Sequence, residues 1–346
     1  MAWSIFEGKK NKMLGIDVGT SSIKIVELTK SGDKIELSNY GEFVETNGVL
    51  QTSSLKLLSE RAAEIIRDIL NEAGIKERKA AMSVPMFSGF STVITMPNMA
   101  EQELNQAVIY EAKKYIPLPL SEVKFEWSKI TSGNNKIGQV DLMIVAVTNE
   151  LINRYQEIAR LSELDLRYVE LDAFSLARAL IDEGEAPSMI IDIGSRSTTM
   201  LVTENDWPMH TRTLEIAGLA FTKLLANSIG VDMKRAESLK YKAGISAAGG
   251  VILPMIDSML MEARRMIDDY AKTRKSAIQK VVLSGGSVSM PGFFEYVVKS
   301  LGKETVIANP FRDIIYEEVL KSTINKTGPS FSVAVGLALR EFKESS

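Results

Sequence analysis

The sequence predicts an α/β fold made of two related halves. Two short segments, Gly15 to Ser22 and Ile190 to Ser197, resemble each other, because each has an apolar run that contains Asp, followed by Gly and hydroxyl residues. Both lead into a second β-rich run, at 23–28 and 198–203, so each predicts a β-hairpin. Strands and amphipathic helices alternate around both hairpins. Two such hairpins at a domain-sized separation indicate a duplicated domain rather than a short-period repeat.

The regions around the hairpins show the alternation of helices and strands expected of an α/β fold. Leu58, Ala62 and Ile65 recur at helical spacing before Gly74, which predicts a helix over 55–73. The other expected elements are strands at 80–84, 89–95, 123–130, 139–148 and 280–284, and helices at 101–115, 150–163, 218–229, 234–241, 254–275 and 332–342.

A linker and an insertion organise the chain into domains. The clearest linker signal, Asp182 to Pro187, predicts a first domain at 1–186 and a second at 187–346. The helix and hairpin between residues 87 and 165 are expected to form a compact subdomain inserted in the first half. The last helix, at about 331–343, is expected to pack back on the first domain.

Length and composition exclude several classes of function. The chain has 346 residues, 45% of them hydrophobic and 25% charged, with a formal net charge of −3. This length and composition are typical of two globular domains, and the slightly negative net charge does not favour binding to nucleic acid. With no cysteine and a single histidine, thiol chemistry, thiolate zinc sites and a Ser-His-Asp triad are disfavoured. No apolar run reaches the ~18 to 20 residues of a transmembrane helix, so no transmembrane segment is expected.

Each hairpin turn carries the groups that a phosphate-binding loop needs. Gly permits a close approach of the backbone, and amides and hydroxyls donate to phosphate oxygens. The candidate nucleotide contacts are Asp17, Gly19, Thr20, Ser21, Ser22 and Lys24 in the first hairpin, and Asp192, Gly194, Ser195, Ser197 and Thr198 in the second. A single turn of this kind is common in ordinary hairpins. The prediction of phosphate binding therefore depends on the presence of both turns in one chain.

A cation and an adenosine complete the predicted site. Asp17 and Asp192, brought face to face, would hold hydrated Mg²⁺ through its waters, because this ion keeps much of its shell and takes few carboxylates. A glycine pair after a strand suits the close approach of an adenosine ring or an α-phosphate. The candidate contacts there are Gly285, Gly286, Ser287 and Met290. The sequence contains neither a P-loop nor a G-x-G-x-x-G fingerprint, which disfavours those two nucleotide-binding classes.

These motifs resemble those of the actin-like ATPases, whose duplicated ribonuclease H-like fold clamps Mg-ATP in a cleft between two domains. The first phosphate motif matches 15–24, the second matches 192–199, the adenosine motif matches 284–292, and the connecting helices match 171–180 and 332–342. The resemblance also implies that Glu237 and Lys240 contact the adenosine. ATP and Mg²⁺ are therefore the expected cofactors.

The run from Glu111 to Leu120, EAKKYIPLPL, is similar to the type IV pilus assembly PilM family, a relative of the FtsA division proteins. This resemblance implies a cytoplasmic ATP-binding adaptor of a pilus or related filament platform, held at the inner membrane through a partner and capable of self-association. The expected partner is the N-terminal cytoplasmic peptide of a PilN-like membrane protein, bound between the first domain and the insertion. The candidate groove contacts are Val93, Thr95, Ala112, Tyr115 and Ile116. The alternative for Tyr115, Phe125 and Trp127 is that they form the core of the insertion.

Catalysis is the less specific part of the prediction. Glu170 and Asp172 lie where members of the superfamily position an attacking water, and the alternative is that they are hinge or cap residues. Arg196 replaces the small residue expected in the second phosphate loop, so it either turns outward or contacts phosphate. Turnover is expected to be slow or absent.

Two other functions use the same fold. A small-molecule kinase would need a dedicated catalytic carboxylate, and no strong candidate lies away from the connecting helix. An FtsA-like filament protein usually ends in an amphipathic tail, whereas this sequence ends at Arg340 to Ser346 directly after the last expected helix. Both remain alternatives to the adaptor.

Overall fold

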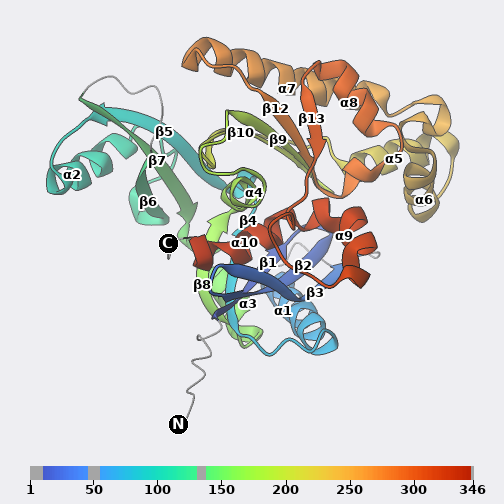
Figure 1. The fold of residues 1–346 in the computed structure, drawn as a ribbon, viewed down its shortest axis with the longest axis horizontal. Coiled ribbons are helices and arrows are strands. Elements are labelled where there is room, and N and C mark those ends of the chain that lie inside the picture. The colour runs from blue at the N-terminus through green and yellow to red at the C-terminus, as the bar shows by residue number, and fades with distance from the viewer. Residues whose placement is uncertain (1–10, 46–54, 131–137, 344–346) are drawn as a thin grey trace, which may run out of the picture.

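The computed structural model describes residues 11–45, 55–130 and 138–343. The first ten residues of the predicted first domain therefore lie outside the described residues. Two five-stranded sheets form the two halves, and a three-stranded sheet projects from the first of them (Figure 1). Each half has its own hydrophobic core, as does the three-stranded sheet.

The two large sheets have the same topology. In the first sheet the order is β3 (Lys34–Val44), β2 (Ser22–Ser31), β1 (Asn11–Val18), β4 (Lys79–Val84) and β8 (Asp165–Leu171). In the second it is β11 (Trp207–Leu214), β10 (Thr198–Glu204), β9 (Ser188–Ile193), β12 (Lys280–Ser284) and β13 (Glu304–Ile307). In both sheets the first three strands are antiparallel and the last two continue in parallel. This equivalence confirms the predicted duplication and both hairpins.

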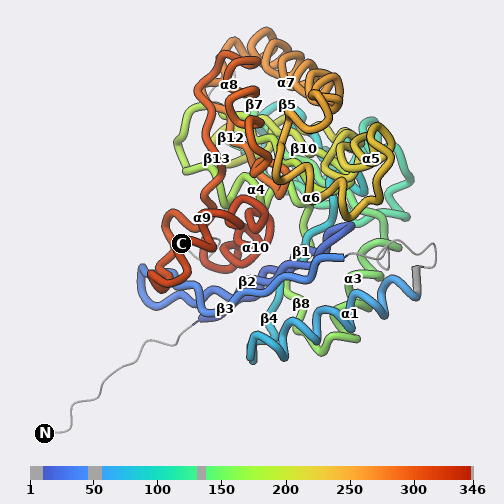
Figure 2. Tube along the Cα trace, turned by 90° about the vertical axis from the view of Figure 1, so that its right-hand side faces the viewer, coloured from blue at the N-terminus to red at the C-terminus, as the bar shows by residue number. Residues whose placement is uncertain are grey.

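Helices cover both faces of the sheets, as α/β architecture requires. They are α1 (Leu55–Glu72), α3 (Asn149–Leu161), α4 (Asp172–Leu180), α5 (Gly218–Ile229), α6 (Met233–Ala243), α7 (Leu253–Arg274), α8 (Phe293–Leu301), α9 (Lys321–Thr327) and α10 (Ser332–Lys343). Figure 2 shows α10 on one side of the first sheet and α1 with α3 on the other.

The last helix crosses back to the first half. Helix α10 packs on β1, β2 and β4 and on the connecting helix α4, which in turn contacts β10 and β11 of the second half. Two glycines permit this approach, because a Cβ on Gly15 would overlap the carbonyl oxygen of Ala334 and a Cβ on Gly336 would overlap that of Ser175. The two helices therefore pack backbone against backbone at the junction of the halves.

The insertion consists of β5 (Gly89–Pro97), α2 (Glu101–Ala112), β6 (Val123–Ile130) and β7 (Gln139–Thr148), with the strands antiparallel in the order β5-β7-β6. Helix α2 ends at Ala112, three residues before the predicted end, since the chain turns toward Pro117 and a residue before proline avoids helical geometry. Helix α3 buries Tyr155 and Ile158 in the core of the first half. We therefore propose that the inserted subdomain ends with β7, before α3, rather than at residue 165.

The insertion also contacts the second half. Met143 and Val93 of the insertion pack with Met209 of β11. Beside them, the Arg274 guanidinium at the end of α7 lies 3.2 Å from the Asp141 carboxylate. The first domain thus reaches the second through the insertion as well as through the two connecting helices.

No single helix in the described part of the chain is long and apolar enough to cross a membrane. One strongly bent pair, Met233–Gly249 with Leu253–Arg274, passes that test by length and composition only. Both members of the pair bury apolar side chains in the core of the second half.

Candidate functional site

The two predicted phosphate loops face each other. In the first, the Gly19 amide donates to the Ser22 carbonyl at 3.0 Å, and in the second the Gly194 amide donates to the Ser197 carbonyl at the same distance. The Ser21 hydroxyl donates to the Ser195 hydroxyl at 2.7 Å across the boundary between the halves. The structure therefore brings together two loops that are 174 residues apart in the chain.

Three carboxyl groups gather beside these loops. Asp17 lies on β1, Asp192 on β9 and Asp172 at the start of α4. Burial raises the pKa of Asp172 well above its usual range, and the negative charges of Asp192 and Asp17 raise it further. Burial also raises the pKa of Asp192 to about 6, against a lowering hydrogen bond from Ser284. This mutual influence places the three carboxyl groups in one electrostatic environment.

Each of these carboxyl groups is held by a neighbouring element. The Ser83 hydroxyl of β4 donates to Asp17 at 2.8 Å, and the Met86 amide donates to Asp172 at 3.1 Å. Ser83 is a residue that sequence reasoning missed. Its only signal is its position at the carboxyl end of a parallel strand, the edge where ligands of α/β sheets bind.

The oxygen atoms of these three carboxyl groups fit a hard cation that keeps its water shell. Carboxylate oxygens are the ligands that Mg²⁺ prefers, and this ion retains several waters. Within the part of the chain that the structure describes, no three acidic or imidazole side chains lie close enough to form a direct metal site. Asp17 and Asp192 remain the two carboxyl groups predicted to contact Mg²⁺ through its waters.

Lys24 places a positive charge beside the first loop. Its ammonium donates to the Ser22 hydroxyl at 2.5 Å and lies 3.4 Å from Glu42, while the residue is only 8% exposed. Thr198 is different, because its buried hydroxyl donates to the Ile216 carbonyl at 2.7 Å. Arg196 is exposed. The Lys24 ammonium thus lies directly beside Ser22 of the first loop, whereas the Thr198 hydroxyl bonds within its own domain.

Lys240 and Glu237 form a polar cluster next to the second loop. The Lys240 ammonium lies 2.8 Å and 2.9 Å from the two Glu237 oxygens and donates to Gly218 and Thr222. Burial lowers the pKa of Lys240, and the Glu237 charge opposes this change. The Gly218 amide in turn donates to the Gly194 carbonyl at 3.1 Å. This hydrogen bond joins the predicted adenosine contacts to the second phosphate loop.

Gly218 and Thr222 also went unrecognised in the sequence. Gly218 begins α5 directly beside Ser287, whose hydroxyl would be 2.6 Å from a Cβ at Gly218. A helix that starts with glycine after a strand is the signal that could have identified the position, because a helix N-terminus favours anions. The Thr222 hydroxyl bonds to both Glu237 and Lys240.

The two glycines of the predicted adenosine loop have different roles. Gly285 has a φ of +91°, and a Cβ there would overlap the Ile193 carbonyl oxygen. At Gly286 the nearest atom to a Cβ is the Tyr241 hydroxyl oxygen, at 3.9 Å. Gly285 therefore fixes the backbone against β9, and Gly286 borders open space. Met290 is only 2% exposed and packs in the core of the second half, so its side chain does not reach the site.

Glu170 takes part in a buried ion cluster rather than in the carboxyl group beside the loops. Its carboxylate accepts from Arg178 at 2.6 Å and 3.0 Å, from Arg340 at 2.9 Å and from Ser175 at 2.6 Å. The two arginines lie on α4 and α10, the connecting helices. These contacts favour a structural role for Glu170, which leaves Asp172 as the candidate to position a water.

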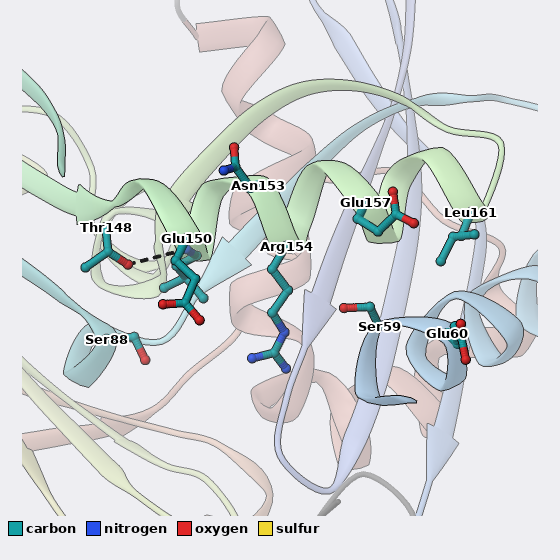
Figure 3. A pocket seen from close by; sticks show the side chains of 10 residues that line it. Ser59, Glu60, Ser88, Thr148, Glu150, Asn153, Arg154, Glu157 and Leu161 are labelled. Carbon is teal, nitrogen blue, oxygen red and sulfur yellow. Dashed lines mark hydrogen bonds between the residues drawn. The ribbon is translucent and has the colours of Figure 1, made fainter. Parts of the chain in front are cut away.

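A hollow lies between α1 and α3 (Figure 3), on the other side of the first sheet from α10 (Figure 2). We call it the α1/α3 groove; its volume is about 470 Å³. Its lining residues are Ser59, Glu60, Ser88, Thr148, Glu150, Leu151, Asn153, Arg154, Glu157 and Leu161. It lies where the insertion joins the first half, because Ser88 precedes β5 and Thr148 ends β7.

Comparison with known proteins identifies the family. The family model for type IV pilus assembly protein PilM matches residues 15–342. The chain belongs to the PilM family. A solved PilM-PilN type IV pilus biogenesis complex contains a similar chain, with 26% identity, a TM-score of 0.82, and coverage of 95% of this chain and 98% of that one.

More distant structures share the actin-like fold. The ethanolamine utilization protein EutJ from Carboxydothermus hydrogenoformans has 18% identity and a TM-score of 0.59, with 95% of this chain and 90% of that chain covered. An MreB protein of Spiroplasma citri bound to AMPPNP has 11% identity and a TM-score of 0.52, with 97% of each chain covered. These likenesses, together with the two equivalent sheets, confirm the predicted duplicated actin-like fold.

The partner contacts predicted from the PilM resemblance lie away from the α1/α3 groove. Val93 packs against the second half, and the Thr95 hydroxyl donates to Asp141 at 2.5 Å. Ala112 and Ile116 are buried in the core of the insertion, and Tyr115 is 45% exposed outside it. None of these five residues lines the groove.

The loop glycines give a prediction that separates folding from binding. Gly285→Ala is expected to lower the free energy of unfolding by ~2 kcal/mol, because the positive φ and the overlap with β9 both oppose a side chain. Gly286→Ala is expected to leave stability within ~0.5 kcal/mol, whereas Gly286→Val should weaken ATP binding by its bulk. Urea denaturation and ATP titration of the three variants check this. Equal stability of Gly285→Ala and Gly286→Ala would contradict the assignment.

The ion cluster gives a pH-dependent prediction. Burial raises the pKa of Glu170, but the charges of Arg178 and Arg340 and the hydrogen bonds from Arg178 and Ser175 together outweigh burial. The pKa of Glu170 in the folded chain therefore lies below its ordinary value. Its contribution to stability is therefore present above the unfolded pKa and is lost as the pH falls through the folded pKa. Glu170→Gln is expected to cost ~3 kcal/mol at pH 7.

Urea denaturation of the wild type and Glu170→Gln between pH 7 and pH 3 measures this contribution. The difference between the two should shrink on acidification below the ordinary glutamate pKa of ~4.3. Glu304→Gln, at an exposed carboxylate on β13, is the control and should change little. A constant difference across the range would rule out an ionised Glu170 as the source of the stability.

Proposed function

We propose that this PilM-family chain is an ATP-binding adaptor of the type IV pilus assembly platform. The observation that supports the nucleotide most strongly is the contact between the two phosphate loops, Ser21 to Ser195 at 2.7 Å, with the Asp17, Asp172 and Asp192 carboxyl groups beside it. The fold by itself would leave the function open, because one fold hosts many functions.

The residues have distinct roles in this proposal. Backbone amides and hydroxyls of the two loops bind the phosphates, and Lys24 adds positive charge. Asp17 and Asp192 hold Mg²⁺ through its waters, and the ion supplies neutralisation of phosphate charge when bound. Lys240, Glu237 and the Gly285-Gly286 turn contact the adenosine. The Glu237 side chain is 45% exposed while Lys240 is buried, so Glu237 presents the accessible edge of this cluster.

Asp172 is the proposed group that positions a water for slow hydrolysis. Its raised pKa suits a carboxyl group that takes up a proton more readily than an ordinary aspartate does. Glu170 has no such freedom, because Arg178 and Arg340 hold its carboxylate. ATP turnover should therefore depend on Asp172 and not require Glu170 beyond its effect on stability.

The proposed partner is the N-terminal cytoplasmic peptide of a PilN-like membrane protein, bound in the α1/α3 groove. The similar chain was solved as a PilM-PilN complex. The groove lies at the boundary between the first half and the insertion, the location that the family resemblance implies, and it is long enough to involve most of α3. In this proposal the chain is cytoplasmic and is held at the inner membrane through that peptide.

Two titrations of the purified chain test this function. Calorimetry with ATP in the presence of Mg²⁺ should give one site per chain. Fluorescence polarisation with the labelled N-terminal peptide of the cognate PilN should give saturable binding. Failure of the first would remove the nucleotide from the proposal, and failure of the second would remove the pilus partner.

A further inference from the structure

Two opposite charges on α3 stand in the α1/α3 groove without an ion pair. Glu150 and Arg154 are four residues apart on one face of the helix, and both side chains point into the groove (Figure 3). Glu followed by Arg at this spacing is the favourable order for a bridge within a helix. Even so, neither makes an ion pair with any residue that the structure describes.

Arg154 also has a buried donor that lacks a partner. Its Nε is out of contact with solvent and makes no hydrogen bond within the described ranges. A buried polar group left unpaired costs free energy, and such groups are rare in folded proteins. Arg154 also lines the groove, and a guanidinium carries five N–H donors and no acceptor, so a ligand in the groove meets a group that can donate to a carbonyl or carboxylate oxygen.

The other charges of the groove decide between these acceptors. Glu157 pairs with Arg160 through two hydrogen bonds of 2.7 Å and 2.8 Å, and Glu60 also lines the groove. With Glu150, three of the residues that line the groove are acidic, whereas Arg154 is the one basic residue of that lining. An acidic side chain would be repelled there, whereas a neutral main-chain carbonyl would not, and a cationic group would be attracted by Glu150.

We propose that the groove selects an extended, positively charged peptide, with Arg154 donating to its main-chain carbonyl oxygens and Glu150 accepting from a basic side chain or an amino-terminal ammonium. This rests on the proposed function and adds the chemistry by which the partner is recognised. An extended backbone offers carbonyl and N–H groups at regular spacing, so the pair on α3 fixes both the direction and the register of the peptide.

The test is fluorescence polarisation of the cognate PilN N-terminal peptide with single-site variants. Arg154→Gln and Glu150→Gln are each expected to weaken binding by about tenfold, which corresponds to ~1.4 kcal/mol. Arg235→Gln on α6 and Glu72→Gln at the end of α1 remove exposed charges outside the groove and should leave the affinity unchanged. Urea denaturation of each variant separates a loss of binding from a loss of fold.

Altered peptides identify the group that Glu150 accepts from. One peptide has its basic residues replaced by glutamine, and another has an acetylated amino terminus. The peptide that lacks the relevant cation should bind the wild type about tenfold more weakly and should no longer distinguish the wild type from Glu150→Gln.

Three outcomes overturn the inference in different ways. Equal affinity of the wild type, Arg154→Gln and Glu150→Gln for the unaltered peptide would refute the role of the pair while leaving the partner in place. Absence of binding to the wild type would refute the partner itself. Stronger binding of a peptide whose basic residues are changed to glutamate would show that the groove prefers the opposite charge.

Discussion

Gly336→Ala is expected to lower the free energy of unfolding by ~3 kcal/mol, because α10 and α4 leave no room for a methyl group between them. A Cβ at this position would overlap the carbonyl oxygen, the carbonyl carbon and the Cα of Ser175. All of these are backbone atoms, so no side chain can rotate away. The gain in helix propensity from glycine to alanine, ~1 kcal/mol, is too small to offset the overlap.

Urea denaturation compares this variant with Gly328→Ala. Gly328 lies shortly before α10, and the nearest atom to a Cβ there is 3.6 Å away, an ordinary contact. That variant should be close to the wild type. If Gly336→Ala were as stable as Gly328→Ala, the two helices would not pack in the way described. The same junction carries Arg178 and Arg340, so loss of the packing should also loosen the ion cluster around Glu170.

Asp17→Ala and Asp192→Ala are each expected to weaken Mg-dependent ATP binding by at least about tenfold, or ~1.4 kcal/mol. Each removes one of the two carboxylates proposed to hold the cation through its waters. For Asp192→Ala the fold should survive, because burial raises the pKa of Asp192 to about 6 and so disfavours its charged form in the folded chain.

Calorimetric titration with ATP, with Mg²⁺ and with a chelator, measures this effect. The wild type should lose affinity when Mg²⁺ is removed, and the two variants should show little further loss. Asp68→Ala, an exposed carboxylate on α1, is the matched control. Unchanged affinity in both variants would contradict the assignment of the two aspartates.

The duplicated halves could be predicted from the sequence because the signals are local. Each hairpin combines an apolar strand, a glycine turn and a second strand, and these patterns gave β1, β2, β9 and β10 and the residues of both phosphate loops. The prediction that the two loops face each other came from the family resemblance and not from the hairpin patterns. Distant contacts such as Ser21 to Ser195 depend on how whole domains pack.

Burial separates several predicted site residues from the others, and the sequence does not display it. Met290 is close to the glycine turn in the chain, but its side chain points into the core. Glu170 lies two residues before Asp172, yet it sits among arginines from two helices, one of them 170 residues away. In the insertion, apolar residues that suit a groove are the same types that form a core, so Ala112 and Ile116 could not be assigned by type.

Helix α3 offers a physical link between the predicted nucleotide site and the α1/α3 groove. Burial raises the pKa of the Tyr155 phenol, and the negative charges of Asp17 and Asp172 raise it further. The preceding residue, Arg154, lines the groove. Helix α3 therefore carries both a residue near the Asp17 and Asp172 carboxyl groups and the residues proposed to bind the peptide. A change at one site can affect the other only through such shared structure.

The most direct test is the affinity of the cognate PilN N-terminal peptide measured by fluorescence polarisation with and without Mg-ATP. We predict saturable binding to one site, with dissociation constants that differ by about fivefold or more between the two conditions. Absence of saturable binding in both conditions would contradict the adaptor function. Binding with equal affinity in both would leave the partner in place and contradict the coupling of the nucleotide cleft to the α1/α3 groove.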